Sequence, residues 1–196
     1  TDKYSPQLVR DNTGIDAPGT FESGYHLTED LIDQAIRMIA DHKVGAPDRP
    51  WLTWVALGAC HAPHQAPREL ILKYDAVFAD GWDAERERRL ARQKALGLVP
   101  ADTRLPPRNE FVQVWDEHSE DERRVFTRRQ AAYAAMLDHS DRHLKRLFDF
   151  LETAGDLDDT LILILSDNGA SQEGGSHGFI NAMGPYNFRP ESIAEK

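Results

Sequence analysis

Apolar residues recur every three or four positions in two stretches of the chain, which is the spacing of one face of an α-helix. The first stretch covers residues 28–45, and the second extends from Ser119 to Gly155. Ser119 and Glu122 have the spacing of a capping box, which opens a helix, and a glycine commonly closes one. A helical pattern of about 35 residues is well beyond the usual helix length, so we expect a kink or a break within it.

Two other stretches are apolar almost without interruption. Residues 51–57 and 160–165 are rich in Trp, Val, Leu and Ile, which is typical of strands buried on both faces of a parallel sheet. Residues 1–24 lack any sustained period and predict a loop, and the charged residues 83–92 predict a short solvated helix. The order helix, strand, loop, helix, strand predicts an α/β fold with a central, mostly parallel sheet flanked by helices.

An acidic and an amide side chain stand directly after the second apolar run. Asp167 and Asn168 supply the oxygen ligands that Ca²⁺ or Mg²⁺ prefers, and Gly169 follows them. The same triplet is also common in turns. Because Ca²⁺ takes about 6 to 8 oxygens, a calcium site would need further ligands from elsewhere. His177 follows in a glycine-rich loop, where it either reaches such a site or is solvated.

Two histidines follow the first apolar run. His61 and His64 lie in a proline-rich loop at the carboxyl end of the predicted strand, where open α/β sheets place their ligands. A zinc site would need further ligands, and Cys60 is too close to His61 to chelate easily. Two interpretations stay open: histidines satisfied by backbone groups, or a donor that faces an anionic oxygen of a substrate.

A second pair of histidines lies within the long helical pattern. His139 and His143 are one helical turn apart, so they share a face of the predicted helix. We interpret them as residues at the edge of the core, bonded to neighbouring carboxylates such as Asp138 and Asp141, and not as metal ligands.

Composition excludes several classes of protein. The hydrophobic fraction of 40% is too high for a disordered chain, and the formal charge of −10 without a basic stripe argues against nucleic-acid binding. No apolar run is long enough to cross a membrane. The single cysteine cannot form an internal disulfide, and neither a phosphate-binding glycine loop nor a Gly-x-Ser-x-Gly nucleophile motif is present.

Several segments together resemble the arylsulfatase family of the alkaline-phosphatase-like superfamily. They occur in the family's order and cover most of the chain. The Ser-Asp-Asn-Gly element alone is moderately specific, but joined to the His-Ala-Pro loop and the Gly-Trp-Asp segment it becomes highly specific. The segments are Gly24–Thr28, Ala62–Pro67, Phe78–Asp83, Arg92–Gly97, Tyr133–Met136 and Leu165–Ala170.

The resemblance implies a Ca²⁺-dependent hydrolase of sulfate esters with the alkaline-phosphatase-like fold. Asp167 and Asn168 match the family's second pair of calcium ligands, and His61 matches the loop histidine that contacts the sulfate or the leaving-group oxygen. His64 matches no catalytic position. The family's nucleophile is a formylglycine made from Cys or Ser in Cys/Ser-x-Pro-x-Arg, and the residues around Cys60 do not match this motif.

Residues 1–196 are therefore expected to be an interior part of one sulfatase catalytic domain, without the N-terminal nucleophile segment and the C-terminal part. The expected partner is a small-molecule or saccharide sulfate ester. The sequence selects no particular ester, oligomeric state or cellular compartment. Two alternatives stay open: a phosphodiesterase or phosphomutase relative, and a degenerate, non-catalytic binding domain. The motif around the nucleophile in the parent gene distinguishes them.

Overall fold

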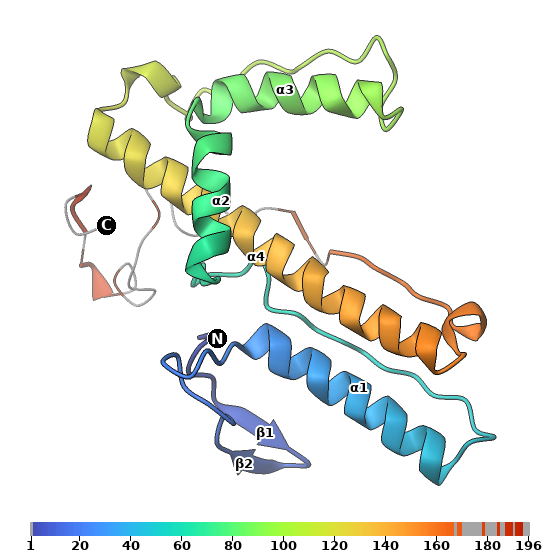
Figure 1. The fold of residues 1–196 in the computed structure, drawn as a ribbon. Helices are drawn as coiled ribbons and strands as arrows, with labels where there is room; N and C mark the ends of the chain where they lie inside the picture. Colours follow the sequence, from blue (N-terminus) through green and yellow to red (C-terminus); the bar gives the residue numbers. More distant parts are fainter. Residues whose placement is uncertain are drawn as a thin grey trace. The chain divides into compact units, whose positions relative to one another are not determined.

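The computed structural model of the chain describes residues 2–166, 168–169, 178, 184, 187–189 and 191–193. These residues fall into two compact units, which are described separately. The first unit comprises Thr1–Pro67 and Ala135–Gly169, and the second comprises Arg68–Ala134 and Ala170–Lys196. The elements, in chain order, are β1 (Leu8–Arg10), β2 (Thr13–Ile15), α1 (Leu27–Gly45), α2 (Arg68–Phe78), α3 (Gly81–Ala95) and α4 (Glu120–Thr153), with 3-10 turns at Trp115–Glu117 and Leu157–Asp159 (Figure 1).

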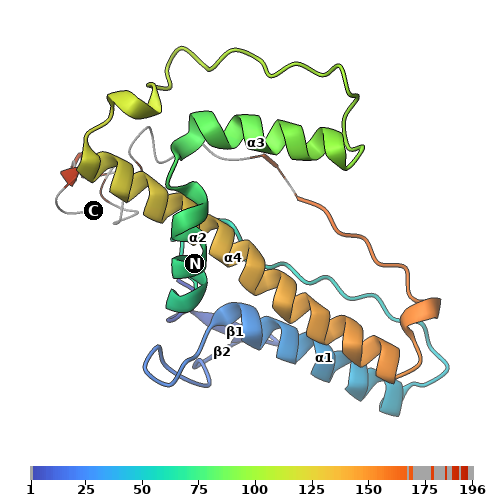
Figure 2. The ribbon, with the colours of Figure 1, turned by 45° about the horizontal axis from the view of Figure 1, so that its top comes forward.

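The helices predicted from periodicity are confirmed, but the predicted break in the long one is wrong. Helix α4 comprises 34 residues, and its two parts belong to different units. Its ribbon is continuous in Figure 2. Its start is a capping box: the Ser119 amide donates to Glu122 Oε2 at 2.9 Å, and the Glu122 amide donates to Ser119 Oγ at 3.3 Å. At its end Gly155 has φ +75°, which a left-handed helix stop requires.

The core of the first unit lies between α1 and the second part of α4, which run side by side (Figures 1 and 2). Ile32 and Ile39 of α1 meet Leu147 and Leu151 of α4, and all four are buried. Burying each such side chain contributes about 1.5 to 3 kcal/mol. Arg146 of α4 forms an ion pair with Asp33 of α1, and Lys43 of α1 forms one with Asp156, just after the end of α4.

The two predicted strands are not formed within the described residues. Residues 51–57 place Trp51, Val55 and Leu57 against the core, but Leu52 is 97% exposed and Trp54 is 87% exposed. All five residues of Leu161–Leu165 are partly or largely exposed. A strand needs a neighbouring strand to pair its backbone groups. Neither segment pairs with one in the part of the chain that the structure describes, so the central parallel sheet is not seen here.

The sheet that does form was missed by the interpretation of residues 1–24 as loop. Strands β1 and β2 pair antiparallel, with Leu8 opposite Ile15 and Arg10 opposite Thr13. Asp11 and Asn12 connect them with φ of 49° and 65°. Positive φ at both central residues is the property of a type I′ turn, which Asp and Asn tolerate well.

The second unit is organised around an aromatic cluster. Trp82 of α3 meets Trp115 edge to face with ring centroids 4.8 Å apart, and both rings contact His118 and Phe126. The Asp83 carboxylate accepts the Trp115 amide at 3.0 Å, and this bond lowers the pKa of Asp83.

The predicted helix over residues 83–92 is confirmed as part of α3, whereas α2 was not predicted. No helix in the described residues has both the length and the apolar character for crossing a membrane.

Gly81 at the start of α3 allows a close approach that no other residue permits. Its φ is +77°, and a Cβ at this position would lie 2.0 Å from the Trp115 ring. We expect Gly81→Ala to destabilise the protein by about 2 to 4 kcal/mol, because backbone strain and overpacking add. Gly97→Ala is the matched control, since Gly97 has φ +70° but open space around it. Urea unfolding followed by circular dichroism measures both, and equal losses would contradict the role of Trp115.

Candidate functional site

His61 lies in the loop that follows residues 51–57 and is exposed. Its backbone amide donates to the Gly58 carbonyl at 2.9 Å, and its Nδ1 lies 2.6 Å from the Ala62 carbonyl oxygen. A carbonyl oxygen only accepts, so Nδ1 carries the proton in this contact. Nε2 is therefore the ring nitrogen that His61 can offer to a ligand. His64, three residues later, is also exposed.

Hydrogen bonds of Lys3 connect this loop to the start of α1. Its side chain is buried, with the whole residue 2% exposed, and Nζ donates to the His61 carbonyl at 3.4 Å. Its backbone amide donates to Gln65 Oε1 at 2.6 Å, and its carbonyl accepts the Leu27 amide at 2.7 Å. Burial lowers the pKa of Lys3. No motif in the sequence singles out Lys3, because its role depends on a loop about 60 residues away.

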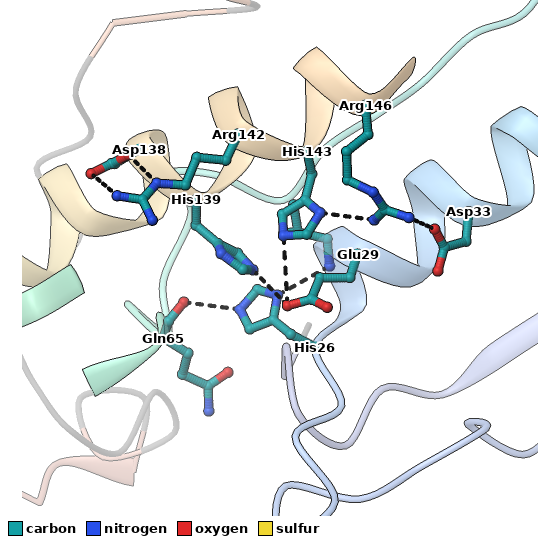
Figure 3. A network of polar contacts seen from close by, with 10 residues as sticks. His26, Glu29, Asp33, Gln65, Asp138, His139, Arg142, His143 and Arg146 are labelled. Atoms are coloured by element: carbon teal, nitrogen blue, oxygen red, sulfur yellow. Dashed lines mark hydrogen bonds and ion pairs between the residues drawn. The ribbon is translucent and has the colours of Figure 1, made fainter. Parts of the chain in front are cut away.

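A cluster of three histidines and one glutamate lies beside the same loop, where α1 meets α4 (Figure 3). His26 caps α1: its Nδ1 accepts the Thr28 amide at 3.1 Å, so its Nε2 donates to the Gln65 carbonyl at 3.3 Å. Its ring packs edge to face against His139, with centroids 4.4 Å apart. The loop, the helix start and α4 are therefore joined by one polar network within the first unit.

The partners predicted for His139 and His143 are wrong. Both rings face Glu29 of α1, with Nε2 to Oε1 distances of 3.4 Å for His139 and 3.6 Å for His143. Asp138 pairs instead with Arg142, whose Nε donates to it at 2.8 Å. Adjacent residues on a helix point in different directions, so a carboxylate next to a histidine is poorly placed to reach it.

The histidines of this cluster are held neutral. Burial lowers the pKa of His139 to about 3, and repulsion from His26 and His143 acts in the same direction. Burial also lowers the pKa of His26 and of His143, and for His143 the nearby Arg146 guanidinium adds to the effect. The rings therefore carry one proton each at neutral pH.

The predicted calcium ligands are only partly described. Asp167 and His177 lie outside the described residues. Asn168 is exposed, and its Nδ2 donates to the Gly169 carbonyl at 2.6 Å, which leaves Oδ1 as an acceptor. Ser166 Oγ donates to the Asn168 carbonyl at 2.6 Å. Within the described part of the chain, no hydrogen bond or ion pair joins Asn168 to His61, so contact between these two predicted site residues is not seen.

Comparisons with known proteins assign the chain to a family. The family model described as Sulfatase matches residues 2–191. The chain is similar to an uncharacterized sulfatase of Schizosaccharomyces pombe, at 34% identity over 76% of this chain and 26% of the relative. It is also similar to an arylsulfatase of Klebsiella aerogenes, at 32% identity over 66% of this chain and 28% of the relative. The matched stretches are thus a minor part of either relative, but they fill most of this chain, which belongs to the sulfatase family.

Proposed function

We propose that the protein hydrolyses sulfate esters, and that His61 contributes to this reaction in the complete catalytic domain. Membership of the sulfatase family supports a hydrolase of this class, and one relative is named as an arylsulfatase. The observation that carries the proposal is that Nδ1 is the protonated ring nitrogen of His61 in its contact with the Ala62 carbonyl. With Nδ1 committed to the Ala62 carbonyl at 2.6 Å, an exposed imidazole keeps Nε2 for the substrate.

His61 is proposed to act on the leaving group. When the ring is protonated, Nε2 donates a hydrogen bond to a sulfate oxygen or to the bridging ester oxygen, and passes its proton to the departing alcohol as the sulfur–oxygen bond breaks. The Ala62 carbonyl holds Nδ1–H throughout, so the ring does not have to turn between steps. Lys3 Nζ holds the His61 carbonyl, and the Gln65 side chain accepts the Lys3 amide, so two hydrogen bonds tie this loop to Lys3.

Asp167 and Asn168 are proposed as ligands of one Ca²⁺ ion, together with residues outside this chain. Asn168 fits this role, because it is exposed and its amide nitrogen is already bonded to the Gly169 carbonyl, so Oδ1 is the atom available. A bound Ca²⁺ would supply positive charge to the sulfate oxygens. The nucleophile would be a formylglycine in a part of the parent protein outside these 196 residues.

We further infer that these residues are part of one catalytic domain, in which residues 51–57 and 160–165 become strands of a central, mostly parallel sheet. Exposed apolar side chains support this inference: Trp54 is 87% exposed, Leu161 is 86% exposed and Leu163 is 76% exposed. Burying them in a sheet would be favourable by about 25 cal/mol per Å² of apolar surface. The polar residues after both segments would then share the carboxyl edge of that sheet.

Turnover of two substrates by the full-length protein tests the proposal. We expect hydrolysis of p-nitrophenyl sulfate and little or none of bis(p-nitrophenyl) phosphate, with no turnover by the 196-residue chain alone. Preference for the phosphate diester would identify a phosphodiesterase instead. Hydrolysis of neither compound, nor of saccharide sulfates, would favour a non-catalytic binding domain. Activity of the isolated chain, abolished by a point substitution in it, would contradict the proposed location of the nucleophile.

A further inference from the structure

Glu29, His139 and His143 have the arrangement of metal ligands. The two histidines are at i and i+4 of α4, which places both rings on one face of the helix, and Glu29 approaches from α1 (Figure 3). One ligand atom from each residue lies within 4.8 Å of the other two. Bond lengths of about 2.0 to 2.2 Å to a tetrahedral Zn²⁺ place neighbouring ligand atoms about 3.3 to 3.6 Å apart. The observed separations of 3.4 and 3.6 Å from Glu29 Oε1 lie within this range.

The burial of His139 points to a ligand at the same place. Its side chain is 5% exposed, and within the described residues its Nε2 is buried without a hydrogen bond. Buried ring nitrogens usually have a partner. A metal ion between His139, His143 and Glu29 would supply that partner.

We propose that Glu29, His139 and His143 bind a divalent first-row transition metal of the Zn²⁺ class. A set of two imidazoles and one carboxylate suits Zn²⁺ better than Ca²⁺, which prefers oxygen ligands. The fourth position is left for water. His26 is not a ligand, because both of its ring nitrogens are engaged, but its ring closes one side of the site against His139. Glu29 is 39% exposed, so an ion can enter beside it.

In the metal-free protein Arg146 is hydrogen-bonded to His143, and this hydrogen bond opposes metal binding. It donates to His143 Nδ1 at 3.0 Å, which leaves the ring proton on Nε2, the atom that faces Glu29. Metal binding requires this proton to move to Nδ1, so Arg146 must release the ring. Arg146 also pairs with Asp33 of α1. Once Arg146 has turned away, the Asp33 carboxylate becomes a candidate acceptor for Nδ1–H, as carboxylates often are behind a metal-bound histidine.

Titration with Zn²⁺ in excess Ca²⁺, after removal of metals with a chelator, tests the site on the full-length protein. We expect one Zn²⁺ per chain at this site, a rise in Tm that the chelator reverses, and tetrahedral d–d absorption bands with Co²⁺. Glu29→Gln and His143→Ala should each weaken binding at least about tenfold, the loss that removing even a supporting residue can cause. His64→Ala, an exposed histidine elsewhere in the unit, is the control and should bind as the wild type does.

Arg146→Met provides a test that does not depend on removing a ligand. Because it deletes the competing donor and keeps an aliphatic stem, we expect it to tighten Zn²⁺ binding by about tenfold, the factor that corresponds to the loss of one competing hydrogen bond of about 1.4 kcal/mol. No binding by the wild type, or equal binding by the wild type, Glu29→Gln and His143→Ala, would overturn the proposal. Unchanged or weaker binding by Arg146→Met would overturn the competition between Arg146 and the metal.

Discussion

Replacing His61 by alanine should lower turnover of the full-length enzyme by about 100-fold or more on sulfate esters of poorly activated alcohols, the usual scale for general acid catalysis. The reason is the state of the ring: Nδ1–H is bonded to the Ala62 carbonyl, with Nδ1 2.6 Å from the oxygen, so in the proposed mechanism Nε2 is the atom that protonates the leaving group. Esters of activated phenols, whose leaving groups need little proton assistance, should lose much less. Steady-state kcat values for an alkyl sulfate and for p-nitrophenyl sulfate measure the difference.

His64→Ala is the matched control for this experiment. It removes an exposed imidazole from the same loop, three residues away, and should change turnover far less. Equal losses at the two positions would show that the wrong histidine has been assigned. A uniform loss on activated and unactivated esters at His61 would indicate a role in binding the sulfate, since proton transfer to the leaving group predicts a dependence on its basicity.

Helices were predictable in this chain because their signals are local. The capping box of Ser119 and Glu122 and the glycine at position 155 lie within a few residues of the ends that they determine, and the structure confirms both. The predicted break in α4 was wrong because it rested on average helix length alone. Packing of its second part against α1 supports a helix longer than the average.

Strands were harder to predict because a strand depends on its neighbours. The apolar run Leu161–Leu165 indicates a preference for extended, buried chain, but it contains no information on which segment will pair with it. In the described residues no partner strand is present beside it or beside residues 51–57. The short hairpin of β1 and β2 differs, because the two strands that pair are neighbours in the sequence. Its turn residues Asp11 and Asn12, which lie between them, are a local signal.

The polar network around His26 depends both on local sequence signals and on contacts between segments far apart in the sequence. The spacing of His139 and His143 placed them correctly on one helical face, but their partner Glu29 is more than 100 residues earlier in the sequence. Glu29 is already explained locally as an acidic residue in the first turn of α1, so the sequence gives no further sign of its contacts with His139 and His143. Lys3 and Gln65 have no local signal, because they act by joining segments that only the tertiary structure brings together.

If the proposed calcium site is correct, replacing Asp167 by alanine should remove the bound ion from the full-length protein and, with it, most of the proposed sulfatase activity. In the proposed sheet, Asp167 would stand at the end of a buried strand formed by residues 160–165, where a carboxylate would be costly without a cation or several donors. Asn168→Ala should have a smaller effect on calcium affinity, since it deletes a neutral oxygen and not a charged one. Metal content by elemental analysis and turnover of p-nitrophenyl sulfate measure both variants.

Excess Ca²⁺ should restore the activity of Asp167→Ala only in part, because the remaining ligands hold the ion weakly and out of place. The matched control is Asp159→Ala, which removes an exposed acid from the segment just before residues 160–165 and should leave calcium content and turnover unchanged. If Asp167→Ala keeps its calcium and turns over normally, the Asp-Asn-Gly triplet is a turn and the ion is bound elsewhere. Loss of calcium with normal turnover would instead show that the ion takes no part in catalysis. The negative charge on the sulfate oxygens would then be stabilised without a cation at this position.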